Sequence, residues 1–358
     1  MKPKFYLAAS VVLMLVFVLV SGTAAAQPPN PCDHDYVVRT GNIIRVSPTG
    51  VDDTDNIQCA FDWAIAEGPG MTIRMLPGTF HTAQILVVGF NGSFRGSGTR
   101  DSEIVNLPDL YVIPDIEHTP PSPGHPWPNL FIFLDSDVTF TNLAIRIVGE
   151  NPVSAWYIGE FGPFTQFGTA IIVSGTESDF RVSNISLEGE HSSTSPIGYN
   201  VFNGIVFSGY VTTTGVDFAP LSGALLVQGS TFETIGWPTA FGNTSDASGL
   251  ISHNTYSDVV VAIDAEDLVN TSLKVFGNRI ETNDAGILAY NVLLPGDVDT
   301  DYEIRNNIIK GPTGIGMFQV LDETSTCLIK GNNLRWVTGE SIILGDGAQT
   351  CVLKNNHE

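Results

Sequence analysis

Positively charged residues are scarce in this sequence, which has 16 Lys and Arg against 38 Asp and Glu and a formal net charge of −22 at pH 7. A surface this acidic repels nucleic acid and anionic lipid, because both carry dense negative charge. It is also a poor general match for polyanionic polysaccharides, unless cations bridge the two surfaces. We therefore expect no nucleic-acid partner.

Long apolar runs and metal-ligand motifs are equally rare. One predominantly apolar run, Phe5 to Val20, follows a basic start and precedes small residues that end at Ala26. This pattern predicts a secretory signal peptide over residues 1–26. The alternative is an uncleaved membrane anchor, which the short run and the Ala-Ala-Ala site disfavour. We expect a secreted or cell-surface protein without a membrane span after cleavage. The seven histidines have no zinc-ligand spacing, which argues against a zinc site.

The last third of the chain is repetitive. A four-residue phrase opens with an apolar residue and closes with a small polar one, at Ser230, Asn254, Asn278, Asn307, Asn332 and Asn356. These closing positions recur at a nearly constant interval, with one longer step between Asn278 and Asn307, and a second apolar run follows each phrase. Such a period is typical of a solenoid, whose coils must stack to bury a shared apolar core.

The four cysteines are consistent with an exported protein and form two pairs in the sequence. Cys327 and Cys351 occupy the same phrase in two consecutive repeats, so we expect them to be stacked in adjacent coils. The strand spacing of about 4.8 Å would allow a disulfide there. Cys32 and Cys59 would then form the other bridge. The alternative is a pair of stacked free thiols in the core, because pairing along a ladder strains the disulfide torsion.

One segment near the N-terminus has a helical pattern. Asp53 and Thr54 can cap a helix over about 54–66, and its apolar residues share one face. These residues are Ile57, Ala60, Phe61, Ala64 and Ile65. A solenoid exposes its core at an open end, so we expect this helix to cover the first coil. We divide the chain into a signal peptide (1–26), an N-terminal segment (27–50) and a solenoid domain (51–358).

Three phrases near this helix carry a family resemblance. They are Asp53-Thr-Asp-Asn-Ile-Gln-Cys-Ala60, Leu76-Pro-Gly-Thr-Phe80 and Gly96-Ser-Gly98. They resemble the opening of pectin-lyase-like right-handed parallel β-helix proteins, from about residue 40 to the end of the chain. The resemblance implies an all-β, single-stranded right-handed parallel β-helix with an N-terminal capping α-helix. It also implies an Asn ladder at one turn, where Asn adopts the left-handed conformation and bonds the Asn of adjacent coils.

The superfamily contains lyases, hydrolases, esterases, tailspikes and inactive proteins, so the fold alone does not choose among them. The Asn-Thr-Asp, Asp-Asp and Gly-His-Gly set of polygalacturonases is absent, as are the pectate-lyase and pectin-esterase phrases. If the chain is an enzyme, we expect a carbohydrate-active lyase or glycoside hydrolase.

A polar column follows the second apolar run of successive coils, at Asn243, Asp264, Asn291, Gln319 and Asp346. In register, these side chains would line one edge of one sheet, with Glu266 and Asp267 nearby. Asp264 and Asp346 are the candidate catalytic carboxylates, and Asn291 and Gln319 are candidate sugar-binding residues. The alternative is ordinary turn polarity.

Loops interrupt the early coils, and one of them is aromatic. Trp156 and Tyr157 lie in an interruption over 151–168, where exposed rings would stack on sugar faces. They could equally fold back over the flank of the solenoid. Insertions at one turn emerge on one side, so the loops between 107 and 222 are expected to form a wall beside the ligand.

Alternating carboxylates at Asp297, Asp299 and Asp301 lie in the longest repeat. Several oxygen ligands on one loop suit Ca²⁺, although a plain acidic loop explains them as well. The sequence thus favours a monomeric secreted β-helix that binds an extracellular polysaccharide and, if it is an enzyme, also cleaves it. The alternative function is a non-catalytic surface, adhesion or structural protein.

Overall fold

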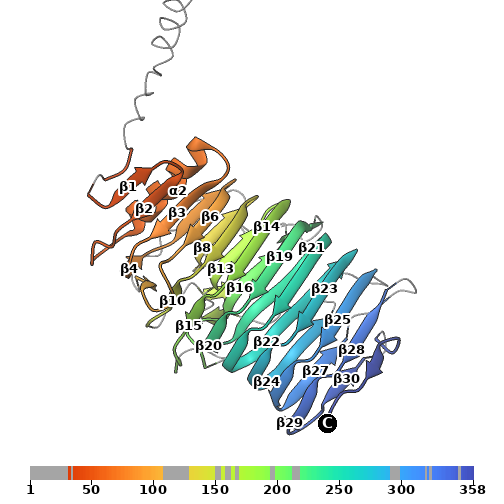
Figure 1. Cartoon of the computed structure of the whole chain (residues 1–358). Coiled ribbons are helices and arrows are strands. Elements are labelled where there is room, and N and C mark those ends of the chain that lie inside the picture. Colours follow the sequence, from red (N-terminus) through yellow and green to blue (C-terminus); the bar gives the residue numbers. More distant parts are fainter. Residues whose placement is uncertain are drawn as a thin grey trace, which may run out of the picture. The chain divides into compact units, whose positions relative to one another are not determined.

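The structure is a computed structural model and describes residues 31–33, 35–107, 129–149, 155–157, 163–165, 169–193, 198–211, 218–290, 299–318, 321, 325–345 and 348–358. From Cys32 onward the chain is a stack of coils joined by parallel strand pairs (Figure 1). The expected right-handed parallel β-helix with an N-terminal helix is confirmed. This is the fold that the resemblance implied.

Each coil contributes strands to three parallel ladders, called faces 1, 2 and 3. Face 1 contains β2 (Ile43–Val46), β3 (Met71–Met75), β6 (Asn91–Arg95), β9 (Asp137–Thr141), β14 (Glu177–Ser183), β19 (Leu221–Gln228), the end of β21 (Trp237–Ser252), β23 (Thr271–Phe276), β25 (Thr300–Arg305), β28 (Cys327–Lys330) and β31 (Val352–Lys354). Face 2 contains β4 (Gly78–Thr82), β7 (Ser102–Asn106), β10 (Ala144–Arg146), β15 (Ser186–Glu188), β20 (Thr231–Ile235), the starts of β22 (Thr255–Val269) and β24 (Arg279–Tyr290), β26 (Ile308–Gly311) and β29 (Asn333–Val337).

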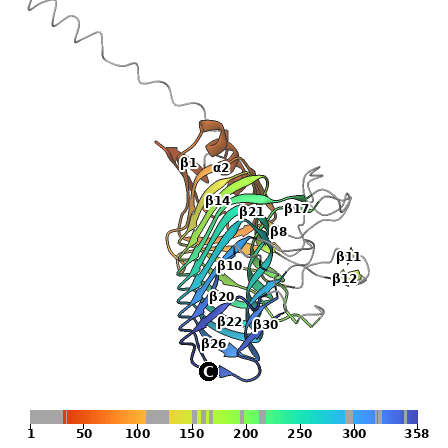
Figure 2. The ribbon, with the colours of Figure 1, turned by 90° about the vertical axis from the view of Figure 1, so that its right-hand side faces the viewer.

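Face 3 contains β5 (Ile85–Val88), β8 (Asn129–Leu134), β13 (Thr169–Ser174), β16 (Asn203–Ser208), the start of β21, the ends of β22 and β24, β27 (Thr313–Met317) and β30 (Ile342–Leu344). Figure 2 shows β8, β21 and β30 on the same side of the coils. Antiparallel pairs supplement the coils: β1 (Val37–Thr40) pairs with β2, β11 (Ala155–Tyr157) with β12 (Pro163–Thr165), and β17 (Tyr210–Val211) with β18 (Phe218–Ala219).

The core lies inside the three faces, because side chains alternate inward and outward along each strand. On face 3, Ile263, Ile287 and Ile315 are in register and at most 1% exposed. Inward aromatic rings fill the early coils, where Phe94 and Phe140 pack with ring centroids 5.1 Å apart. This continuous apolar column is what the repeat pattern predicts for a solenoid.

Helix α2 (Thr54–Glu67) covers the first coil, as expected. Its buried face contacts β2, β3 and β5, and Phe61 stacks on Phe94 with centroids 5.1 Å apart. Asp53 precedes the helix but makes no side-chain cap, so that part of the prediction is wrong. Its carboxylate instead accepts the backbone N–H groups of Thr49 (2.6 Å) and His81 (3.0 Å), which fixes the approach to the helix.

The expected Asn ladder is present at the turn between faces 1 and 2. It begins at Asn254, whose Oδ1 accepts the N–H of Ser230 at 2.9 Å. Each later member accepts the backbone N–H and the side-chain amide of the Asn one coil before, and these members are Asn278, Asn307, Asn332 and Asn356. The left-handed residue is not the ladder Asn but the one before it, such as His253 (φ 56°) or Asn306 (φ 55°). The turn thus needs two adjacent residues with different tasks.

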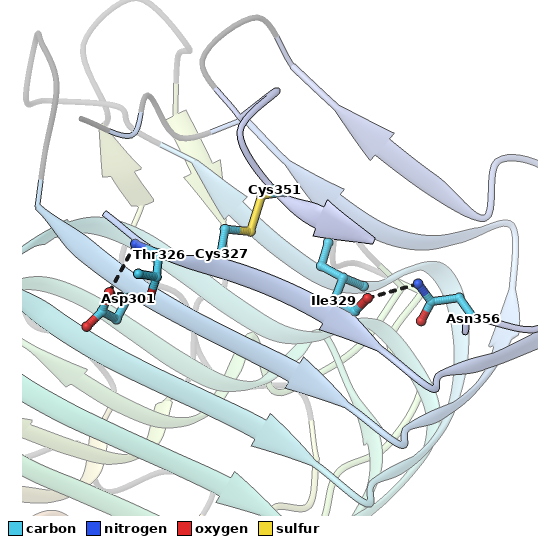
Figure 3. The surroundings of a disulfide bond; sticks show 6 residues. All are labelled: Asp301, Thr326, Cys327, Ile329, Cys351 and Asn356. Atoms are coloured by element: carbon cyan, nitrogen blue, oxygen red, sulfur yellow. Dashed lines mark hydrogen bonds between the residues drawn. A yellow bond between two sulfur atoms is a disulfide. The ribbon is translucent and has the colours of Figure 1, made fainter. Parts of the chain in front are cut away.

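Both predicted cysteine pairs are disulfides. Cys32 bonds Cys59 and ties the N-terminus to α2, and Cys327 bonds Cys351 with their Cα atoms 4.5 Å apart. The second bond links the last two strands of face 1, β28 and β31. In β28, the carbonyl oxygen of Ile329 also accepts a hydrogen bond from Asn356 Nδ2 at 3.0 Å (Figure 3). The C-terminal coil is therefore held by a covalent link and by the end of the Asn ladder.

The Cys327→Ser/Cys351→Ser double variant is expected to lose about 3 kcal/mol of stability, because the bridge closes a loop of 24 residues in the unfolded chain. Urea unfolding of both proteins measures this loss. The matched single variants, each with one free thiol, should lose about as much. No change in midpoint would show that the last coil unfolds separately and leaves the main transition unaffected.

The long connections of the chain all begin or end at a strand of face 3. The connections over 107–128, 147–168 and 189–202 lead from face 2 to face 3 in the early coils. Those over 209–220, 291–299, 318–326 and 345–351 lead from face 3 to face 1. Face 3 therefore receives the insertions at both of its edges, whereas the sequence analysis expected a single wall. Across the described residues, no helix is long and apolar enough to cross a membrane.

Candidate functional site

Two carboxylates lie on the outer surface of face 3, on strand β22. Ile263 and Ala265 point into the core and are fully buried, so Asp264 and Glu266 point outward in the alternation. They are two residues apart on one face of a strand, which separates their Cα atoms by roughly 6.6 Å. The fold thus places two acid groups side by side outside the core.

Asp264 lies in an apolar outer column. Its register neighbours are Ala240 on one side and Leu288 on the other, and Asp264 itself is 8% exposed. Tyr290 donates its hydroxyl to Asp264 Oδ2 at 3.2 Å, while the buried Oδ1 has no hydrogen-bond partner among the described residues. Burial raises the pKa of Asp264 to about 7, although the Tyr290 hydrogen bond opposes this shift.

Glu266 is half-buried beside Asp264 and in register with Gly242 and Tyr290. Burial raises its pKa to about 7, and the charges of Asp264 and Asp267 contribute to the same shift. Both carboxyls therefore keep a proton to a higher pH than free carboxyls do. The pKa of Tyr290 is also raised, first by burial and then by both carboxylates.

An exposed aromatic side chain follows along the same face. Phe318 comes directly after β27, donates its N–H to Ala289 O at 2.7 Å and is 44% exposed. A Cβ at Gly316 would lie 2.8 Å from the Phe318 ring, and one at Gly345 would lie 3.1 Å from it. The two glycines therefore make room for the ring. Two strand spacings, about 10 Å, separate Phe318 from Glu266.

This arrangement has the parts that glycoside hydrolysis needs. One protonated carboxyl and one carboxylate, roughly 5–9.5 Å apart, serve as acid and as base or nucleophile. An accessible aromatic ring close by can stack on the apolar face of a sugar. The sequence analysis named Asp264 and Glu266 but missed Tyr290 and Phe318. Their equivalent positions at the ends of successive repeats could have indicated that they lie on the same face.

The predicted polar column is wrong at Asp264, which is not in register with Asn243. Asp264 pairs with Ala240, three residues before Asn243, so Asn243 and Asp264 do not stack. The position that corresponds to Asn243 is Asp267, and both residues have positive φ, 48° and 50°. Asn291, Gln319 and Asp346 lie outside the described residues, so their assigned roles stay predictions.

The aromatic loop is described only in its backbone. Strand β11 pairs with β12, with Trp156 opposite Phe164, in the connection that leads from face 2 to face 3. The side chains of Trp156 and Tyr157 lie outside the described residues. Their role in sugar binding stays a prediction.

Of the three aspartates assigned to calcium, Asp297 lies outside the described residues. Asp299 accepts the N–H of Thr271 through its backbone carbonyl (3.3 Å). Asp301 Oδ1 accepts both the backbone N–H and the hydroxyl of Thr326 (Figure 3). Asp301 therefore joins two coils. No cluster of three or more His, Cys, Asp or Glu suited to a metal occurs in the described part of the chain.

A second polar cluster lies where β22 turns from face 2 to face 3. His191 Nε2 contacts Asp258 Oδ2 at 3.0 Å, and Tyr199 donates to Asp258 Oδ1 at 3.1 Å. Asn283 donates to Tyr199 (2.6 Å) and to Asp258 (3.0 Å). His191 is largely exposed, and its segment pairs with Tyr199. The cluster fastens the connection over 189–202 to the coils at the edge of face 3.

Comparisons with known proteins give only distant matches. No protein-family model matches the sequence, and no curated protein matches it. Among solved structures, the family 28 exopolygalacturonase of Yersinia enterocolitica is 10% identical with a TM-score of 0.41, and the match covers 88% of this chain and 78% of that one.

Two further structures give similar values. The A-module of a mannuronan C-5 epimerase from Azotobacter vinelandii is 9% identical with a TM-score of 0.35, and the match covers 86% of this chain and 95% of that one. A Geobacillus virus E2 protein is 12% identical with a TM-score of 0.36, and this chain spans 63% of its length. Such low values assign neither an activity nor a ligand to this chain.

Proposed function

We propose that the outer surface of face 3 binds an extracellular polysaccharide and hydrolyses it with Asp264 and Glu266. The observation that carries this proposal is the carboxyl pair, with Asp264 buried and Glu266 half-buried, which has no basic partner among the described residues. An exposed aromatic ring lies about 10 Å away along the same face. A solenoid that served only as a spacer gains nothing from two desolvated carboxyls, since burying them costs stability. Perturbed carboxyls of this kind are concentrated at functional sites.

The two carboxyls have different surroundings, which suggests different roles. Asp264 receives the Tyr290 hydroxyl, a contact that favours its carboxylate form and suits a base or nucleophile. Glu266 has a longer side chain, is more accessible and faces the charge of Asp264, which favours the protonated form that a general acid needs. Phe318 would hold a neighbouring sugar.

Several sequence predictions extend this proposal. Asn291 directly follows Tyr290, and Gln319 directly follows Phe318, so both would offer amide groups to sugar hydroxyls. Trp156 and Tyr157 would contribute a second aromatic surface from the β11–β12 hairpin. Secretion of the protein, after cleavage of residues 1–26, is supported by the two disulfides, which form in oxidising compartments.

The test is a screen of purified protein against a panel of polysaccharides, scored for binding and for release of reducing ends. On any polymer that is cleaved, Glu266→Gln should lower kcat about 10²- to 10⁴-fold while binding is retained. Phe318→Ala should instead weaken binding about ten-fold through the loss of stacking. Trp336→Ala is the matched control, because Trp336 is 53% exposed but lies on face 2.

The possible outcomes separate the candidate functions. Binding without product release from any polymer would make face 3 a recognition surface and the enzyme proposal wrong. A wild-type protein that binds no glycan at all would favour the structural alternative. Equal effects of Phe318→Ala and Trp336→Ala would remove face 3 from the binding site.

A further inference from the structure

The basic residues of this protein are segregated by face. Beyond Lys4 the chain has fourteen Lys and Arg. Eight lie on face 1, four lie on face 2, and the other two are Arg39 on β1 and Arg100 in the turn before β7. Face 3 and its seven long connections contain no Lys or Arg.

Acidic residues are not excluded from this side. The strands of face 3 carry Asp264 and Glu266, with Asp267 directly after them, and the sequence of the seven connections adds twelve Asp and Glu. Clefts and faces of a single charge sign produce potentials that attract one class of ligand and repel the other. Since neither the strands of face 3 nor the sequences of these connections contain Lys or Arg, none of their residues offsets the repulsion of an anionic polymer.

A second, independent observation points to a ligand group. Asp264 lies on this face with 8% of its surface exposed, so it is about nine-tenths buried. Its Oδ1 is buried and accepts no hydrogen bond from any described residue. Leaving a buried acceptor unpaired is unfavourable, because the atom has lost its water without gaining a donor. A sugar hydroxyl or ammonium group would supply the missing donor. The carboxylate of a uronic acid would not, because it is an acceptor only.

We infer that face 3 takes a glycan without acidic groups, whose hydroxyl or ammonium donor meets Asp264, and that it rejects polyuronates and sulfated glycans. This inference rests on the proposed function, since it names the substrate class of the same site. Two classes of polymer meet this description, namely neutral polysaccharides and polymers of amino sugars. Both carry hydrogen-bond donors and no negative charge.

Matched polymers test the inference with the wild-type protein. Polygalacturonate and its fully methyl-esterified form share a backbone, and so do the hexamers of glucosamine and N-acetylglucosamine. Affinity electrophoresis is run on these and on the polysaccharide panel, in EDTA and in 1 mM calcium. For any backbone that binds, the anionic form should bind at least ten-fold more weakly than its uncharged form. The hexamers then distinguish a neutral ligand from an ammonium-bearing one.

Salt provides a second readout that does not depend on activity. Binding of an ammonium-bearing glycan should weaken as sodium chloride rises from 20 to 500 mM, whereas binding of a neutral one should not. Tight binding of polygalacturonate, in EDTA or through calcium, would overturn the inference and leave the proposed function intact. If no polymer of any charge binds, both are wrong.

Discussion

Replacing Asp264 by Asn is expected to stabilise the protein at pH 8 and to abolish polysaccharide cleavage. The pKa of Asp264 rises from 3.8 in the unfolded chain to about 7 in the folded protein. Folding therefore disfavours the carboxylate, and the resulting loss of stability sets in as the pH rises above about 4 and is complete above about 7. The shift corresponds to a loss on the order of 4 kcal/mol at pH 8.

The Asn side chain removes this charge but leaves a buried amide, whose unpaired N–H groups cost about 1–3 kcal/mol. Tyr290 can still donate to the amide oxygen. The net gain at pH 8 is therefore expected to be about 2 kcal/mol, and it should become a loss of about 1–2 kcal/mol near pH 4, where only the cost of the amide remains. Urea unfolding at several pH values measures both trends. The activity should fall at least 10²-fold, since the base or nucleophile is lost.

Glu233→Gln is the matched control, because it makes the same change in net charge at an exposed position on face 2. It should alter neither the pH dependence nor the activity. A wild-type stability that does not fall between pH 5 and pH 8 would contradict the raised pKa. An Asp264→Asn variant that is more stable and fully active would show that the buried carboxyl is not used in catalysis.

The sequence predicted the fold because the repeat reports the physical constraint directly. Each coil needs an apolar run, a turn and a polar residue at the same place, so the ladder from Asn254 to Asn356 was visible as spacing. The bridge between Cys327 and Cys351 followed from the same repeat interval. Helix α2 was predicted from the helical spacing of its apolar residues, and its place over the first coil from the need to cover an open solenoid end.

The site was harder to predict, because it depends on register and on which side of a strand a residue faces. One repeat interval from Asn243 leads to Asp267, not to Asp264, and a shift of three positions along a strand reverses the side chain's direction. The same interval from Glu266 leads to Tyr290. Phe318 could not be placed, because the insertion over 291–299 lengthens the next repeat.

The segregation of charge was also hidden in the linear sequence. Basic residues are spread along the whole chain, and only the assignment of strands to faces shows that they avoid face 3. On face 1, Arg45, Arg74 and Arg95 even occupy one register column. The net charge predicted poor binding of polyanions, but it could not say which surface has no basic residues.

The Asn278→Ala variant is expected to lose about 3–5 kcal/mol of stability, the largest structural effect among our predictions. Asn278 Oδ1 accepts the N–H of Asn254 at 2.9 Å and its side-chain amide at 3.1 Å. Asn278 Nδ2 donates to Ile251 O and to Asn307 Oδ1, both at 3.0 Å. Alanine removes all four hydrogen bonds and leaves their buried partner groups unsatisfied. Each unsatisfied group costs about 1–3 kcal/mol.

Asn356→Ala is the matched comparison, because Asn356 ends the ladder and makes the same contacts except the one to a following Asn. It accepts the N–H and the side-chain amide of Asn332, both at 3.0 Å, but it is only half-buried. Water can replace the lost partner there, so the expected loss is about 1 kcal/mol. Urea unfolding gives both values, and amide hydrogen exchange at Asn254 locates the defect. Equal losses in the two variants, or unchanged exchange at Asn254, would mean that apolar packing holds the coils in register without the ladder.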